Sequence, residues 1–237
     1  MLSDRKISLQ TETKTMEKEK VEATVRTIKQ SFRLLMNGVT AQSMRDKGVQ
    51  YKLNWGASLL HLREMAAEYE KDYDLAIALW KEPIRECKIL AGLLQPVDTF
   101  LPEIADIWID TMPTVEIAEL TSMNLFQHLP YAPAKAFRWI ADERELAQVC
   151  GFLTIARLLQ KKGDMEDRVA NEFLDQAVSC FLAGSYAVRN AVSAALRRFM
   201  EHSEEHAFRA CRCVDGMKDS SSEGERLLYE VVSAVVE

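Results

Sequence analysis

Residues 144–161, RELAQVCGFLTIARLLQK, have the pattern of a long amphipathic helix, because apolar residues recur every three or four positions. The rest of the C-terminal part continues in the same way, since no proline follows Pro133. Glycines at 163, 184 and 216 mark the expected breaks between helices. We therefore predict further helices near 166–183, 185–201, 204–214 and 223–236.

Shorter helices are expected in the N-terminal half. All six prolines fall between 83 and 133, where they separate helical segments. No alternating apolar run longer than about five residues lies between turn signals, so the sequence gives little indication of strands. The helices predicted in this half lie near 17–36, 41–47, 57–69, 74–81, 84–94, 104–110, 114–125 and 134–140.

Helices of this length, joined by short loops, predict an all-α fold. Helix pairs recur about every 35–45 residues, which is typical of HEAT-like repeats stacked into an α-solenoid, a right-handed superhelix of helical hairpins. A compact bundle without repeats is the alternative. Residues 1–16 are polar and lack an apolar period, so we predict a flexible N-terminal segment followed by a single repeat domain over 17–237.

Composition excludes several classes of protein. The net charge of −6 excludes a generally basic nucleic-acid-binding protein, although a local basic patch is compatible with it. No apolar run is long enough for a membrane span, and the N-terminus lacks the apolar core of a signal peptide. The five cysteines are scattered rather than arranged as a disulfide framework, so we expect a cytoplasmic protein without membrane partners.

The most distinctive stretch of sequence lies within residues 34–91, which include LLMNGVTAQSMRDKGVQYKLNWGASLLHLREMAAEY and LAIALWKEPIRECKILA. In order and spacing this text resembles the AlkD-type DNA alkylation repair family, whose members consist of HEAT-like repeats. The resemblance continues more weakly to about residue 200. Within the quoted text, Arg85 and Glu86 are well placed to bridge neighbouring helix pairs.

The resemblance implies an alkylpurine DNA glycosylase, which releases cationic N3- or N7-alkylated purines from duplex DNA without a cofactor or metal. In that family tryptophans line the cleft and attract the cationic lesion, while a carboxylate stabilises the sugar. Glu119 stands where the family has its catalytic aspartate, and Trp108 and Trp139 are the aromatics expected nearby. Core packing is an equally plausible role for both tryptophans.

Several positions depart from the family pattern. Val115 and the Ser193–Ala194 pair stand where the family has tryptophans, and Gln148 and Val149 stand where it has paired arginines. The glutamate at 119 also moves the carboxylate by more than an ångström, a misplacement that can reduce the rate about 100-fold. The sequence therefore predicts a degenerate active site with weak or lost base excision.

The placement of charge bears on DNA binding. No Lys or Arg lies between Lys88 and Lys135, a stretch that carries a charge of −6 and includes Glu119. Phosphates are repelled from such a stretch unless other helices supply cations. The candidate suppliers are Lys161, Lys162, Arg189, Arg197 and Arg198.

Two other interpretations follow from the sequence. His202, His206, Cys211 and Cys213 have a spacing that could hold a metal only if the chain turned after Ala210, so an ordinary helix is expected there. The leading prediction is a member of the repair family that binds duplex DNA or a protein on its concave face. The alternative is a non-enzymatic scaffold for protein–protein contacts.

Overall fold

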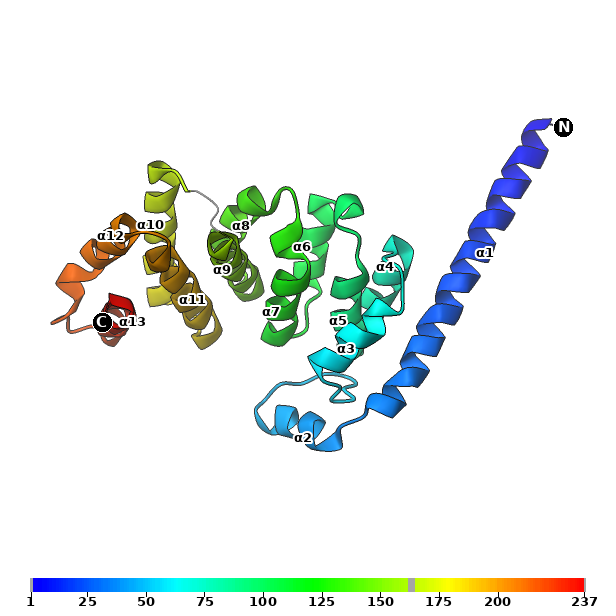
Figure 1. Cartoon of the computed structure of the whole chain (residues 1–237), viewed down its shortest axis with the longest axis horizontal. Helices are drawn as coiled ribbons and strands as arrows, with labels where there is room; N and C mark the ends of the chain where they lie inside the picture. The colour runs from blue at the N-terminus through cyan, green and yellow to red at the C-terminus, as the bar shows by residue number, and fades with distance from the viewer. Residues whose placement is uncertain (1, 162–164, 237) are drawn as a thin grey trace. The chain divides into compact units, whose positions relative to one another are not determined.

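A computed structural model describes residues 2–161 and 165–236 of the chain, and nearly all the elements there are helices (Figure 1). The only β-type pairing within these residues is an isolated parallel bridge between Leu53 and Ile84. The prediction of an all-α fold is thus confirmed. The chain divides into two compact units, Met1–Phe100 and Leu101–Glu237.

The first unit contains five α-helices and two short 3-10 helices. Helix α1 begins at Leu2, so it includes the N-terminal segment for which the sequence predicts flexibility, and residues 15–20 of it are all exposed. The elements are α1 (Leu2–Ser31), η1 (Phe32–Leu35), α2 (Gly38–Asp46), α3 (Leu59–Ala67), α4 (Tyr73–Lys81), α5 (Arg85–Leu94) and η2 (Val97–Thr99).

The second unit contains the longer helices predicted for the C-terminal half. None of the described helices in the chain is long and apolar enough to cross a membrane. The elements are α6 (Pro102–Asp110), α7 (Val115–Asn124), η3 (Phe126–His128), α8 (Ala132–Ile140), α9 (Glu145–Gln160), α10 (Asp167–Ala183), α11 (Tyr186–His202), α12 (Glu204–Val214), η4 (Asp215–Met217) and α13 (Glu223–Val236).

Local sequence sets where many of these helices begin. The side chains of Asp72, Thr114, Ser185 and Ser203 each accept a hydrogen bond from the backbone N–H three residues later. Such an N-cap stabilises a helix by roughly 1 kcal/mol. Pro102 occupies the first turn of α6, where its missing N–H is harmless. These signals explain why the predicted helix positions agree closely with the observed ones.

A buried ion pair holds the loop before α3 in the first unit. Glu86 is fully buried and accepts hydrogen bonds from the backbone N–H groups of Trp55 (3.2 Å) and Ala57 (3.3 Å) and from Arg85 Nη1 (3.2 Å). Arg85 Nη1 also donates to the carbonyl of Ala57 at 2.9 Å. The pair therefore fixes the loop that carries Trp55.

Close backbone contact holds the same loop from its other side. The N–H of Asn37 donates to the carbonyl of Trp55 at 2.8 Å. The next residue, Gly56, has φ of +71°, and a Cβ there would lie 2.2 Å from the Asn37 carbonyl oxygen. Only glycine fits this approach, since other residues would be strained and would clash.

In the second unit, α7, α9 and α11 pack side by side and form one layer, while α8 and α10 pack behind it on α9 and α11 (Figure 1). Gly151 permits the close crossing of α8 and α9, because a Cβ there would lie 2.6 Å from Ile140 Cγ2 and 2.8 Å from the Ala136 carbonyl oxygen. We call the side of this layer that faces away from α8 and α10 its open side, or the α7–α9–α11 face.

Candidate nucleic-acid interface

Three contacts set the register of the α7–α9–α11 face. Cys150 Sγ lies 3.9 Å from the Ala118 carbonyl oxygen, and Lys161 Nζ lies 3.4 Å from that of Gln127, so α7 and α9 run parallel. Ser185 Oγ donates to the carboxylate of Glu145, which brings the first turns of α9 and α11 to the same level. The register follows directly from these pairs.

At this register Glu119 lies level with residues 151–153 of α9 and 191–194 of α11. The side chains that reach the open side there are Leu153, Ser193 and Ala194, which are partly or fully exposed. None of these three side chains is aromatic or cationic. Of the positions at which the sequence departs from the family pattern, Ser193 and Ala194 lie at this level.

The electrostatics of Glu119 agree with this description. Glu119 is exposed on α7, yet surrounding protein partly displaces water and raises the pKa of its carboxyl group. The like charge of Glu116, one turn earlier, raises the pKa further. No cation among the described residues offsets these two effects, so both shift the pKa upward.

The two tryptophans predicted to line the cleft lie in the core instead of on the open side. Trp108 and Trp139 are each 1% exposed. The Trp139 indole N–H donates to Asp106 Oδ1 at 2.9 Å, and its ring centroid lies 4.8 Å from that of Phe126. Their surroundings are those of the core-packing role that the sequence left open. Neither indole face is accessible to a ligand in this arrangement.

The acidic stretch is partly neutralised by helices later in the chain. Lys135 pairs with Asp106, and Arg144 pairs with Asp110 and with Asp142. Burial alone would raise the pKa of Asp106, but hydrogen bonds from Lys135 and Trp139 outweigh it, so the pKa lies below its usual value. The repulsion that the sequence predicts for phosphate is therefore weaker in the folded chain.

The candidate cations differ in how far they are engaged within the protein. Arg189 donates to the carbonyl oxygens of Phe181 (3.0 Å) and Leu182 (3.4 Å) at the end of α10. Arg198 pairs with Glu201 at 2.7 Å. These two guanidinium groups therefore already have partners within the chain.

The remaining candidate cations are Lys161, Lys162 and Arg197. Lys161 is exposed at the end of α9, although its Nζ lies 3.4 Å from the Gln127 carbonyl oxygen and from His128 Nδ1, and Lys162 lies outside the described residues. Arg197 is exposed on α11 and has no hydrogen bond or ion pair with any described residue. Arg197 lies two helix spacings from Glu119, roughly 16–20 Å. It is available to a ligand on the open side but does not reach that carboxylate.

One exposed aromatic on this face was missed by sequence reasoning. Tyr186 is 81% exposed at the start of α11, and Asn190 and Arg197 lie along the same exposed stripe. The four-residue spacing of Tyr186 and Asn190 places both residues on one face of a helix, and this spacing can be read from the sequence. The sequence alone does not show whether this ring is exposed or packed, because that depends on the neighbouring helices.

The chain matches a family model described as DNA alkylation repair enzyme over residues 28–212, which is more than three quarters of its length. The chain belongs to this family. The resemblance seen in the sequence is thereby confirmed. No curated protein matches the chain.

A solved structure supports the fold of this family member. Over 88% of this chain and 94% of the other, the two structures align with a TM-score of 0.74 at 15% sequence identity. That structure is described as "A new family of proteins related to the HEAT-like repeat DNA glycosylases with affinity for branched DNA structures". At this identity the likeness establishes a fold of HEAT-like helical hairpins, as the sequence predicted.

The rings of His202 and His206 are neighbours, with centroids 5.2 Å apart. His206 is buried, its backbone N–H donates to Ser203 Oγ at 3.1 Å, and its ring Nδ1 lies 2.8 Å from the same oxygen. Its ring centroid lies 4.4 Å from that of Phe199. Within residues 2–161 and 165–236, no three His, Cys, Asp or Glu side chains are close enough to hold a metal ion.

Proposed function

We propose that this protein binds duplex DNA on the α7–α9–α11 face and excises alkylated purines weakly or not at all. Membership of the DNA alkylation repair enzyme family supports a role on DNA. The observation that carries the loss of excision is the level of Glu119, where the neighbouring helices present Leu153, Ser193 and Ala194. A cationic base at that level meets no aromatic face, and the carboxylate has no cation beside it.

The accessible cations support phosphate binding away from Glu119. Arg197 and Lys161 are exposed, and Tyr186 offers a ring on the same face as Arg197. The protein of known structure with the same fold is described as having affinity for branched DNA, which supports DNA binding by this one. Binding would take place in the cytoplasm, since Cys87, Cys150 and Cys180 are buried free thiols.

The test of lost excision is a base-release assay. Purified protein is incubated with duplex DNA that carries 7-methylguanine, and free base is measured against an active glycosylase of the family. We expect release near the uncatalysed background. Release at rates near those of the active enzyme would refute the proposal.

The test of DNA binding uses two exposed arginines. Arg197→Gln removes a cation from the face, whereas Arg138→Gln removes an exposed cation from α8, behind the layer. For duplex DNA each lost phosphate contact lowers the slope of log affinity against log salt by about 0.9. We expect this change for Arg197→Gln and none for Arg138→Gln. Equal slopes for both variants would argue against binding on this face.

A protein scaffold is the second candidate, and a different observation favours it. Leu34, Met36 and Val39 are large apolar side chains that lie 88%, 62% and 83% exposed within six residues. Apolar groups gathered on a surface often mark a protein contact. This candidate predicts no shift of duplex DNA at moderate salt, which the same titration measures.

A further inference from the structure

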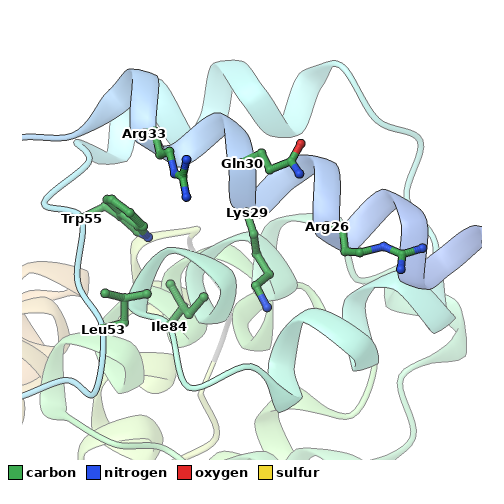
Figure 2. Close-up of a pocket in the computed structure, with 7 residues that line it drawn as sticks. All are labelled: Arg26, Lys29, Gln30, Arg33, Leu53, Trp55 and Ile84. Carbon is green, nitrogen blue, oxygen red and sulfur yellow. The ribbon is translucent and has the colours of Figure 1, made fainter.

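A cavity in the first unit has no part in the function proposed above. Its volume is about 290 Å³, which is at the lower end of the range for small-ligand sites and too small for a double helix. Helix α1 forms one side, and the loop before α3 together with the start of α5 forms the other (Figure 2). The lining residues are Arg26, Lys29, Gln30, Arg33, Leu53, Trp55 and Ile84.

The apolar wall of the cavity is held in place by the backbone. Leu53 and Ile84 form the isolated parallel bridge, and the N–H of Arg85 donates to the Leu53 carbonyl at 3.0 Å. The backbone of Trp55 is fixed between Asn37 and the buried Glu86. A wall fixed in this way is preorganised, so a ligand would not have to order it on binding.

Trp55 brings both a ring and an unused hydrogen-bond donor to the cavity. Its indole Nε1 is buried and has no hydrogen-bond partner. In Figure 2 the nitrogen end of the ring points into the space beneath α1. Trp80, Trp108 and Trp139 are buried, so Trp55 is the partly exposed tryptophan of the chain. A buried donor without an acceptor is unfavourable, and a ligand acceptor in the cavity would relieve this.

Helix α1 brings positive charge to the other side. Residues 23–36 contain three cations and no acidic residue. Lys29 is paired with Glu82 at 2.8 Å, which leaves two positive charges. Arg26 and Arg33 are exposed and have no hydrogen bond or ion pair with any described residue. Arg26 lies in α1 and Arg33 in η1, both line the cavity, and seven residues separate their backbone positions by about 10 Å.

We propose that this cavity binds one unpaired nucleotide of a DNA strand. The base stacks on the face of Trp55, a sugar or phosphate oxygen of the strand accepts a hydrogen bond from its in-plane Nε1–H, and neighbouring phosphates contact Arg26 and Arg33. Aromatic faces bind bases of any sequence in single strands, and cations bind the backbone beside them. A strand offers a separate phosphate to each of the two arginines, whereas a mononucleotide offers one phosphate to both, so a continuing strand fits better. The inference rests on the protein meeting DNA, as proposed above, but uses no residue of the α7–α9–α11 face.

The test measures binding of a labelled oligo(dT) by anisotropy and follows tryptophan emission in the same titration. Stacking on Trp55 should quench part of the emission, and Trp55→Leu should abolish that change and weaken binding about ten-fold or more. Trp55→Phe keeps a ring but loses the donor, so its affinity should lie between the two. Far-UV circular dichroism checks that each variant is folded.

The exposed arginines provide a variant that does not disturb the core. Arg26→Gln/Arg33→Gln should lower the salt slope for oligo(dT) by about 1.4, because each single-strand phosphate contact contributes about 0.7. The matched control is Lys47→Gln/Lys71→Gln, which removes two exposed charges elsewhere in the first unit. The control should leave the slope unchanged.

Three outcomes would overturn the proposal. These are unchanged oligo(dT) binding in both cavity variants, an equal loss in the lysine control, and quenching by dTMP at concentrations as low as those needed for oligo(dT). Arg197→Gln separates this inference from the proposed function. If the protein binds oligo(dT) but not duplex DNA, the duplex proposal fails and the cavity proposal stands. If it binds duplex DNA but not oligo(dT), the cavity proposal fails and the duplex proposal stands.

Discussion

Glu86→Ala should be one of the most destabilising single substitutions in the first unit. The carboxylate is fully buried and faces Arg85, whose side chain is 5% exposed. Its removal leaves a buried guanidinium without its counter-ion and removes the acceptor of the Trp55 and Ala57 backbone N–H groups. Loss of one partner from a buried ion pair typically costs about 3–5 kcal/mol.

Hydrogen exchange measured by mass spectrometry resolves this effect within the first unit. Since each 1.4 kcal/mol is a factor of ten, amides in α5 should exchange roughly 100- to 4,000-fold faster, up to the limit set by global unfolding. The control is Glu201→Ala, which breaks the exposed pair with Arg198, whose side chains are 45% and 42% exposed. Exposed pairs contribute about 0.2–1 kcal/mol, so exchange in α11 should change only a few-fold. Similar effects of both substitutions would refute the reasoning.

Three further substitutions test the second unit by urea unfolding. Asp106→Asn should cost about 1 kcal/mol at neutral pH by weakening the hydrogen bonds from Lys135 and Trp139. The pKa of Asp106 is lower in the folded than in the unfolded protein, so its contribution to stability should be complete above the unfolded pKa of about 4. The contribution should disappear as the pH falls through the folded pKa. A difference in stability between wild type and variant that does not change with pH would contradict this. Gly151→Ala should cost about 1–3 kcal/mol by overpacking the crossing of α8 and α9, and an unchanged midpoint would show that the crossing can relax. Arg189→Gln should cost about 1 kcal/mol by releasing the last carbonyls of α10 while duplex affinity stays constant; lost affinity in a stable variant would instead assign Arg189 to DNA binding.

The positions of the helices were predictable because their signals are local. Apolar period, N-cap residues and prolines act within a few residues of the helix that they define. The two compact units, Met1–Phe100 and Leu101–Glu237, reflect contacts between distant segments within each unit, which leave no local pattern in the sequence. The single domain over 17–237 stays a prediction.

The candidate site was only partly predictable. The sequence identified Glu119 and the departures from the family pattern, and the register of α7, α9 and α11 brings Ser193 and Ala194 to the level of Glu119. The cleft role predicted for Trp108 and Trp139 did not anticipate their burial, because a tryptophan on the apolar side of a helix has the same spacing whether it lines a cleft or fills the core. The cavity at Trp55 could not be predicted from the sequence, because its two sides come from separate segments.

The sequence by itself determined that this chain forms helices, where most of them lie, and which family it resembles. Local periodicity and turn chemistry suffice for the helices, although they did not predict that α1 begins at Leu2. Tertiary structure decided which charges are neutralised, since Asp106 finds Lys135 and Glu82 finds Lys29 across separate helices. It also decided which ring is left partly exposed with an unused donor, namely Trp55. Exposure and pairing depend on neighbours far apart in the chain, and only the folded chain brings them together.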